Sequence, residues 1–306
     1  LKGSNHPVRL LLGLSPLSTS MLRTPILLSI IPFAGAYRLL PGIRWRTFTN
    51  CRNMLTCTSL DEWNSPKAGK HQGLRVKRSL EKLPWQLVAD HLFMEKVNGD
   101  WLLQERVVNL GAPKELLQSK FQEAALAVTC DLPTPCAKIV YEDALALATA
   151  SHKMVPDGQD LSMKLELFGE NVCSRWHKDN YVCRSIVSYN CAATMYTENS
   201  NVNFEELCNC GNNDCIIRDK SQIRSVDVGD LLMIKGSLFP GKAKGLVHKS
   251  PEVSYYDTGD VKARIVLKVD IEGRDDSGEY MDDRGWYSRL KCLLFKALAY
   301  RAGAKG

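Results

Sequence analysis

Hydrophobic residues follow two different periods along the chain. Between residues 81 and 155 they recur at helical spacing, as at Leu117, Phe121 and Ala124. From Leu161 onward they alternate with polar residues, and this alternation continues in short segments to about residue 272. The pattern therefore predicts an α+β fold in which N-terminal helices precede a β region.

The predicted strands are short, and turn residues separate them. They are expected at 161–168, 172–177, 181–189, 193–197, 216–217, 223–226, 231–235, 246–249 and 264–271. So many short strands in one region favour a small barrel or a double-sheet jelly roll, with the helices packed against it.

One domain is expected over residues 81–306. It would contain a helical part (81–155), a β-barrel (160–272) and an amphipathic C-terminal helix (284–300). The polar and basic segment 61–80 is typical of a solvated linker.

The first sixty residues have the composition of a transit peptide. Residues 1–60 are rich in Leu, Ser, Thr and Arg and contain no Asp or Glu. They predict a disordered leader and a mitochondrial location, with a cytoplasmic location as the alternative, and Met21 is a candidate start of translation. The apolar stretch 25–36 is too short to span a bilayer, so no transmembrane segment is expected.

The net charge of +6 belongs to this leader. Seven of the 40 basic residues lie in residues 1–60, which leaves 33 basic against 34 acidic residues in the rest of the chain. The main part of the protein therefore has no bulk attraction for phosphates, and nucleic acid is not an expected partner.

The segment His177-Lys178-Asp179 carries the candidate chemistry. Residues i and i+2 of a strand share a face, so His177 and Asp179 would point the same way. Among the six histidines, His248 is the best candidate for a third ligand, because it lies on a later predicted strand of the same β region. Two histidines and one carboxylate form the facial triad of non-haem Fe(II) enzymes. The sequence thus predicts a mononuclear site for Fe(II), or for zinc.

Two further residues are candidates for holding a cosubstrate. Arg264 begins an alternating strand whose other face carries Ile265, Leu267 and Val269. An arginine buried without a partner is costly, and a bound carboxylate would compensate it through two parallel hydrogen bonds. A dicarboxylate such as 2-oxoglutarate would fit. Tyr189 could hydrogen-bond the same cosubstrate, although an aromatic strand residue without such a role is the alternative.

The β region resembles a known family of uncharacterised proteins, domain of unknown function 1826. The resemblance is carried by His177-Lys178-Asp179, 184–189, Gly229-Asp230-Leu231, Ile234-Lys235-Gly236, 245–251 and 264–270. The order of its motifs is similar to that of the 2-oxoglutarate/Fe(II) oxygenases, which use a double-stranded β-helix. This similarity implies His177, Asp179 and His248 as metal ligands and Arg264 as the cosubstrate anchor.

Three cysteines close together, Cys208, Cys210 and Cys215, could also hold zinc. No nearby residue supplies an evident fourth ligand, and the polar segment 199–214 is typical of a surface loop, so their role stays open.

Three classes of function remain compatible with these patterns. The first is a dioxygenase-like enzyme that acts on a small molecule. The second is a cupin-like protein that binds zinc without redox chemistry, and the third is a non-catalytic interaction module. Nothing in the sequence identifies a substrate.

Overall fold

The computed structural model describes residues 52–95, 102–170, 172, 174–210 and 212–273. The strands are β1 (Arg52–Cys57), β2 (His71–Val76), β3 (Leu102–Asn109), β4 (Asp160–Phe168), β5 (Cys183–Ser188), β6 (Met195–Tyr196), β7 (Arg224–Ser225), β8 (Leu231–Lys235), β9 (His248–Lys249) and β10 (Arg264–Ile271). The α-helices are α1 (Trp85–Glu95), α2 (Lys114–Val128), α3 (Thr134–Met154), α4 (Phe204–Asn209) and α5 (Asn213–Ile216). Short 3₁₀ helices occupy Leu60–Asn64, Ala68–Lys70, Asn199–Asn201 and Lys220–Gln222.

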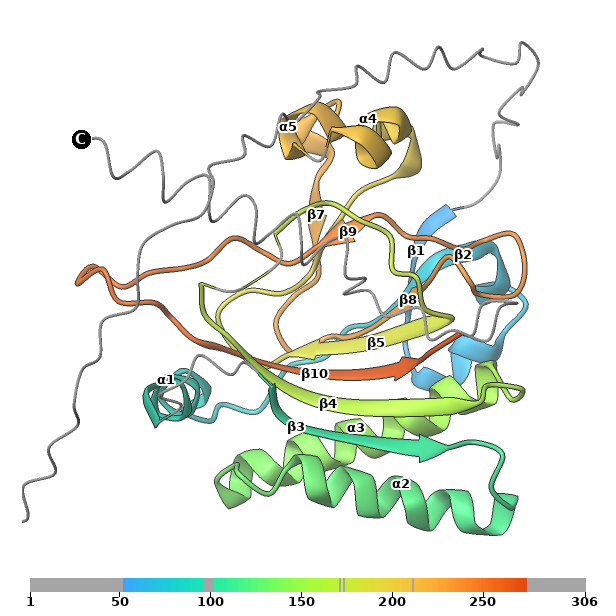
Figure 1. The fold of residues 1–306 in the computed structure, drawn as a ribbon, viewed down its shortest axis with the longest axis vertical. Helices are drawn as coiled ribbons and strands as arrows, with labels where there is room; N and C mark the ends of the chain where they lie inside the picture. Colours follow the sequence, from blue (N-terminus) through green and yellow to red (C-terminus); the bar gives the residue numbers. More distant parts are fainter. Residues whose placement is uncertain (1–51, 96–101, 171, 173, 211, 274–306) are drawn as a thin grey trace, which may run out of the picture. The chain divides into compact units, whose positions relative to one another are not determined.

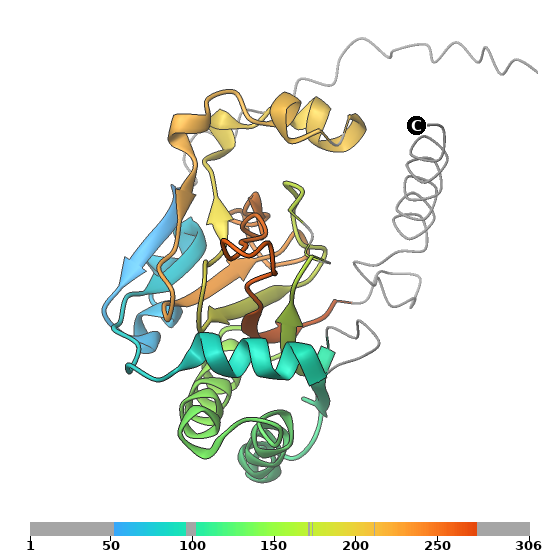
Figure 2. The same ribbon diagram turned by 90° about the vertical axis from the view of Figure 1, so that its left-hand side faces the viewer.

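The strands form a large and a small sheet. The large sheet has the order β1-β2-β8-β5-β10-β4-β3, and the small sheet has the order β7-β6-β9. All pairs are antiparallel except β1 with β2. Helices α2 and α3 cover one side of the large sheet, and the small sheet lies on the other side (Figure 1, Figure 2). The expected α+β class is therefore confirmed.

The chain passes repeatedly from one sheet to the other. After β4 in the large sheet it reaches His177, which bridges to His248 beside the small sheet, and then returns to the large sheet as β5. It continues through β6 and β7 of the small sheet, β8 of the large, β9 of the small and β10 of the large. Among the described strands none of the large sheet pairs with one of the small sheet, so the expected closed barrel does not form there.

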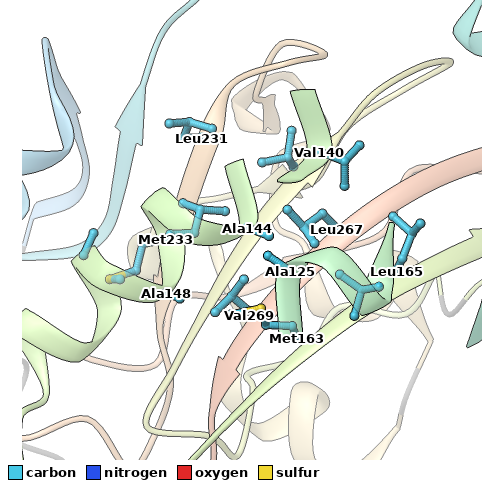
Figure 3. Packing of buried hydrophobic residues seen from close by; sticks show 14 of the residues in the cluster. Ala125, Val140, Ala144, Ala148, Met163, Leu165, Leu231, Met233, Leu267 and Val269 are labelled. Carbon is cyan, nitrogen blue, oxygen red and sulfur yellow. The ribbon is translucent and has the colours of Figure 1, made fainter. Parts of the chain in front are cut away.

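One face of the large sheet forms the main hydrophobic core. Leu161, Met163, Leu165 and Leu167 share this face of β4, as their alternation predicts, and all are buried. They pack with the odd-numbered residues of β10 and with residues of α2 and α3 such as Ala125 and Val140 (Figure 3). This packing fixes which residues of each strand face the helices, because a shift of one residue would turn the apolar set away from them.

The other face of the large sheet carries buried charges. Lys164 and Glu166 of β4 lie on this face, as do Lys268 and Asp270 of β10. Arg184 of β5 is opposite Asp270 in the antiparallel register. The burial of so many charges requires that they pair with one another, because an isolated buried charge is very costly.

Several segments differ from their sequence-based description. The segment 61–80 is not a solvated linker, because it contains β2, whose six residues are all buried between β1 and β8. Strand β1 falls within the range 1–60 that was expected to be a disordered leader. The predicted helical part also contains β3, which forms an edge of the large sheet beside β4.

Other corrections concern the β region. The described residues 174–177 are not a regular strand, since only His177 forms a β-bridge there. Ile216 ends α5, and Ile217 makes a single bridge with Val202 instead of the expected strand. The segment 199–214 is not a plain loop, because it contains α4 and the start of α5. The C-terminal helix predicted at 284–300 lies outside the described residues, as do residues 1–51. No helix in the described ranges combines the length and the hydrophobicity that a membrane span needs.

Lys235 of β8 is a buried cation without an ion-pair partner in the described part of the chain. Its Nζ atom donates to the carbonyl oxygen of Ala68 at 2.8 Å and lies 4.7 Å from the ring centre of Phe239. Only 1% of Lys235 is exposed, and this burial lowers the pKa of its ammonium group to about 8. The folded state therefore binds fewer protons than the unfolded state between about pH 8 and the ordinary lysine pKa of about 10.4.

We expect Lys235→Met to change how stability depends on pH. Below about pH 8 the wild-type chain must keep a charged ammonium buried, whereas at high pH the ammonium is neutral in both states. The stability of the variant relative to wild type should therefore fall by about 3 kcal/mol as the pH rises from 8 to about 10.5. Urea unfolding across this range measures the difference, and parallel pH profiles of the two proteins would contradict the prediction.

Candidate metal centre

The two predicted histidine ligands lie side by side because their backbones pair. The N–H of His177 donates to the carbonyl oxygen of His248, and the N–H of His248 donates to that of His177, both at 3.0 Å. This reciprocal pair extends the small sheet by one bridge beyond β9. The ring centres are 4.5 Å apart, so the two imidazoles project to the same side of the bridge.

Asp179 completes the cluster from the same short segment as His177. Nε2 of His177 lies 3.6 Å from Oδ1 of Asp179, and Nε2 of His248 lies 3.4 Å from Oδ2. One ligand atom from each residue falls within 4.8 Å of the other two. The structure thus brings together the three residues that the sequence proposed, from positions up to 71 residues apart.

Hydrogen bonds at the far side of each ring determine which nitrogen faces Asp179. Nδ1 of His177 lies 2.8 Å from the carbonyl oxygen of Arg175, and Nδ1 of His248 lies 3.0 Å from that of Leu246. A carbonyl oxygen can only accept, so each Nδ1 carries the proton and each neutral ring presents the lone pair of Nε2. This is the tautomer that metal-binding histidines use.

The carboxylate of Asp179 leaves one oxygen for a cation. Oδ1 accepts a hydrogen bond from Arg184, but Oδ2 is buried and has no hydrogen-bond partner among the described residues. A buried oxygen without a partner is costly. The Nε2 lone pairs of His177 and His248 point to the same region as this oxygen. Together these three donor atoms suit a divalent cation.

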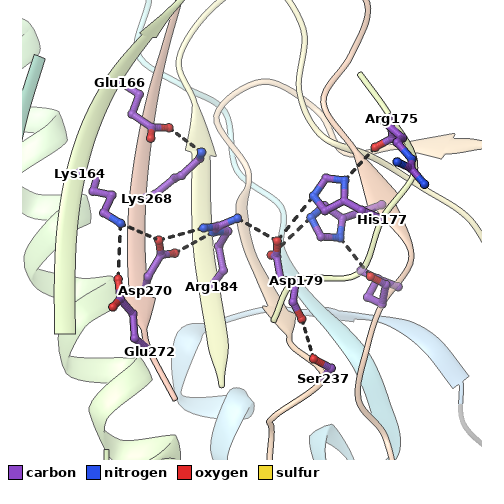
Figure 4. A network of polar contacts seen from close by, with 12 residues as sticks. Lys164, Glu166, Arg175, His177, Asp179, Arg184, Ser237, Lys268, Asp270 and Glu272 are labelled. Atoms are coloured by element: carbon purple, nitrogen blue, oxygen red, sulfur yellow. Dashed lines mark hydrogen bonds and ion pairs between the residues drawn. The ribbon is translucent and has the colours of Figure 1, made fainter. Parts of the chain in front are cut away.

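Arg184 links the cluster to the charged face of the large sheet (Figure 4). Its Nη1 atom donates to Oδ1 of Asp179 at 2.8 Å. Its Nε and Nη2 atoms donate to the two oxygens of Asp270 at 2.8 and 3.1 Å, and Lys164 lies 3.7 Å from the same carboxylate. Arg184 therefore holds the Asp179 side chain in one orientation. The sequence analysis did not identify this residue as part of the site.

Charge and burial set the protonation states of the cluster. For His177, burial opposes the charged form, but the contact with Asp179 raises the pKa of its ring above the usual value. Burial lowers the pKa of His248 to about 4, although Asp179 opposes this effect. Burial alone would raise the pKa of Asp179, but Arg184 and the two histidines lower it well below its usual range. At neutral pH His248 is therefore neutral and Asp179 is ionised, as ligation demands.

A glycine positions the backbone that carries Asp179. A Cβ atom at Gly236 would lie 1.9 Å from the carbonyl oxygen of Tyr181 and 3.2 Å from that of Asp179. The next residue, Ser237, donates its backbone N–H to the same Asp179 carbonyl at 2.9 Å. Only glycine allows this close approach, so residue 236 helps to fix where the carboxylate lies.

Arg264 is buried on the face of the sheet that the alternation predicts. It begins β10, whereas Asp270 lies near the end, about 20 Å away along the strand. Its Nη1 atom donates to the carbonyl oxygen of Ala192 at 3.3 Å, and its guanidinium lies 5.2 Å from the ring centre of Phe168. Burial lowers the pKa of Arg264 to about 10. In the described part of the chain no carboxylate lies within ion-pair distance of it.

The hollow beside Arg264 is small. Its volume is about 20 Å³, and its lining includes Cys191, Glu252 and Ser254. That volume holds about one water molecule. The structure gives Arg264 no direct contact with the His–Asp–His cluster.

Tyr189 does not reach the cluster. It follows β5 and points to the helix-covered face, whereas Arg184 points to the charged face, because residues an odd number apart in a strand face opposite ways. The Tyr189 hydroxyl donates to Asp143 of α3 at 2.8 Å, and its ring stacks on Trp85 at 4.8 Å. This placement corrects the expected cosubstrate contact and matches the alternative of a packed strand aromatic.

One protein family matches this chain. A family model described as "Protein of unknown function (DUF1826)" matches residues 102–270, which is more than half of the chain. No curated protein matches the sequence.

Solved structures show a distant likeness. A full-length Neurospora crassa protein in complex with alpha-KG has a TM-score of 0.36 and 11% identity, covering 76% of this chain and 90% of that one. The same protein with alpha-KG and 5-formyluracil has a TM-score of 0.36 and 9% identity, covering 72% and 83%. Such low TM-scores carry no inference about chemistry, which must come from the site.

Proposed function

The chain belongs to the DUF1826 family of proteins of unknown function, and we propose that it is a mononuclear Fe(II)- and 2-oxoglutarate-dependent dioxygenase. One observation carries the proposal: Nε2 of His177, Nε2 of His248 and the partnerless Oδ2 of Asp179 face one another. Two imidazoles and one carboxylate are the facial triad of non-haem iron oxygenases.

The strand succession supports a double-stranded β-helix as the scaffold. In the large sheet β4, β10, β5 and β8 are neighbours, and in the small sheet the His177 bridge, β9, β6 and β7 follow one another. The chain therefore forms two facing layers of four strands each, counting the His177 bridge as one, and crosses from one layer to the other, as in jelly rolls. In this arrangement His177 and His248 lie on the small sheet, and Asp179 lies where the chain leaves that sheet to enter β5 of the large one.

The chain's own residues would prepare the site for catalysis. A bound Fe(II) would supply open coordination positions for a cosubstrate and dioxygen, and hence the oxidation of a C–H bond. The Arg175 and Leu246 carbonyl oxygens hold each imidazole with Nε2 facing inward. Arg184 occupies Oδ1 of Asp179, so the carboxylate would bind through Oδ2 alone.

We propose Arg264 as the anchor of the 2-oxoglutarate carboxylate. Its guanidinium is buried, lies on the same face of the large sheet as Arg184, and has no carboxylate partner among the described residues. A bound dicarboxylate would supply the missing counter-charge through paired hydrogen bonds. None of the three cluster residues lines the adjoining hollow of about 20 Å³, so this hollow must both widen and open toward the cluster to admit it.

The proposal can be tested without knowing the substrate. Anaerobic addition of Fe(II) and then 2-oxoglutarate to the full chain should give a visible charge-transfer band, since 2-oxoglutarate chelates open positions on the iron. Admission of air should then yield succinate and carbon dioxide in equal amounts. Arg264→Leu should weaken the dependence of the band on 2-oxoglutarate by at least tenfold and leave Fe(II) binding unchanged.

Two results would refute this function. One is the absence of both the band and succinate although Fe(II) binds at the cluster. The other is zinc at unit occupancy that 2-oxoglutarate neither displaces nor perturbs, which would favour a cupin-like metal-binding protein without redox chemistry.

A further inference from the structure

A second group of metal-binding side chains lies on the α4–α5 hairpin. One ligand atom each from Glu206, Cys210 and Cys215 falls within 4.8 Å of the other two. All three residues lie outside the His–Asp–His cluster, and helices α4 and α5 lie outside both sheets (Figure 1). The cysteines are exposed, so the group is open to ions in solution.

Local backbone structure brings the three together. The N–H of Cys210 donates to the carbonyl oxygen of Glu206 at 3.0 Å, so these two side chains lie one helical turn apart on one face of α4. Asn212 caps α5 by accepting from the N–H of Asp214 at 3.0 Å. Its carbonyl oxygen accepts from the N–H of Cys215 at 3.1 Å, which turns the chain back so that the Cys215 thiol meets that of Cys210.

The neighbouring Cys208 is not part of this group. It precedes Cys210 by two residues, which places it about 200° around the helix axis. Cys208 instead acts on the ammonium group of Lys178. Burial lowers the pKa of this ammonium group, and the charge of Cys208 opposes the shift only in part. The chain thus offers one exposed thiol outside the group, Cys208, next to the two exposed thiols inside it.

The charge around the two thiols favours a cation over thiol chemistry. Reactive thiolates lie near positive charges or helix N-termini. Here the hydrogen bond with Cys210 and the nearby charges of Cys210, Glu206 and Asp214 raise the pKa of the Cys215 thiol. A bound divalent cation would reverse this by displacing the thiol protons and balancing three negative ligands.

We propose that Glu206, Cys210 and Cys215 form a second metal site that binds a thiophilic divalent cation, with Zn²⁺ as the expected ion. Thiolate and carboxylate are ligands that zinc accepts in tetrahedral sites, and water would take the fourth position. The site goes beyond the proposed oxygenase function and does not depend on it, because it uses different residues and softer ligands.

A cation here would stabilise the segment that carries His177. The side-chain oxygen of Asn213 accepts from the N–H of Trp176 at 3.0 Å, and its amide donates to the carbonyl oxygen of Ser174 at 2.9 Å. Arg175 donates to the carbonyl oxygen of Leu207 at 3.3 Å. The hairpin is therefore bonded to residues 174–176, immediately before the first proposed iron ligand.

Cobalt(II) titration of the full, reduced chain under anaerobic conditions tests the site. Thiolate ligation gives a near-ultraviolet charge-transfer band that nitrogen and oxygen ligands do not give. We expect this band to be displaced by Zn²⁺ and to saturate at one equivalent in His248→Ala, in which the His–Asp–His cluster no longer competes for cobalt. Cys210→Ser and Cys215→Ser should each abolish it or weaken zinc binding by at least 100-fold, whereas the matched control Cys208→Ser should leave it unchanged.

A second comparison separates the two sites. His248→Ala should remove Fe(II) binding at the His–Asp–His cluster and leave the thiolate–cobalt band intact, and Cys215→Ser should retain Fe(II) binding, which also shows that the variant is folded. The proposal is overturned if Cys208→Ser removes the band as strongly as Cys215→Ser does. It is equally overturned if the reduced chain gives no band, or if the Cys210 and Cys215 variants keep it.

Discussion

Replacing His248 with alanine is expected to lower the affinity for Fe(II) by more than about 100-fold, because loss of even an outer-shell partner of a metal ligand costs about 10–100-fold. His248 lies at the centre of the arrangement: its backbone pairs with His177, the residue is 3% exposed, and its Nε2 faces Oδ2 of Asp179. The variant would leave two ligands, His177 and Asp179, which cannot form a facial triad. Anaerobic Fe(II) titration measures the affinity, and succinate formation should fall to background.

His91→Ala is the matched control. His91 lies on α1, its side chain is 68% exposed, and its one ion pair among the described residues is with Glu95 one turn further along the helix. It should bind Fe(II) like wild type. Equal affinities of wild type and His248→Ala, or equal losses in the two variants, would show that the metal does not bind at this cluster.

The sequence predicted best where packing imposes a strict period. The residues Leu161 to Ile271 contain β4, β8 and β10 close to their expected bounds, since one face of each strand is buried against the helices. The same alternation placed Arg264 on the face opposite Ile265. It also placed His177 and Asp179 together, although their segment makes only a single β-bridge.

The sequence failed where tertiary contacts override local composition. The polar segment 61–80 has the composition of a linker, yet β2 is buried because it lies between two strands that are distant in sequence. The Asn-rich segment 199–214 has the composition of a loop, but Asn212 begins a short helix by capping it. Neither outcome is encoded in hydrophobic periodicity.

The sequence proposed the three residues of the cluster but not the residues that support them. The position of Tyr189 in the chain makes it a candidate for the site, but the alternation of side chains along β5 directs it to the opposite face, toward Asp143. Arg184 is not among the predicted site residues, although it lies five residues after Asp179 and on the charged face of the sheet. The signal for Arg184 in the sequence is the same as that for Arg264, namely a charged residue at an inward position of a predicted strand.

Arg184→Met is expected to lower the free energy of unfolding by about 3–5 kcal/mol, the cost of removing one partner from a buried ion pair. The substitution roughly keeps the side-chain length but leaves the carboxylates of Asp179 and Asp270 buried. Among the described residues, Asp270 would then keep one ion pair, with Lys164 at 3.7 Å. Saturating Fe(II) should recover part of the loss, since a cation at Asp179 replaces one of the missing positive charges. Urea unfolding with and without Fe(II) measures both effects, and Arg224→Met on the exposed strand β7 should cost no more than about 0.5 kcal/mol. If Arg184→Met were as mild as Arg224→Met, the link from Asp270 through Arg184 to Asp179 would not hold the site, and the orientation of Asp179 would need another cause.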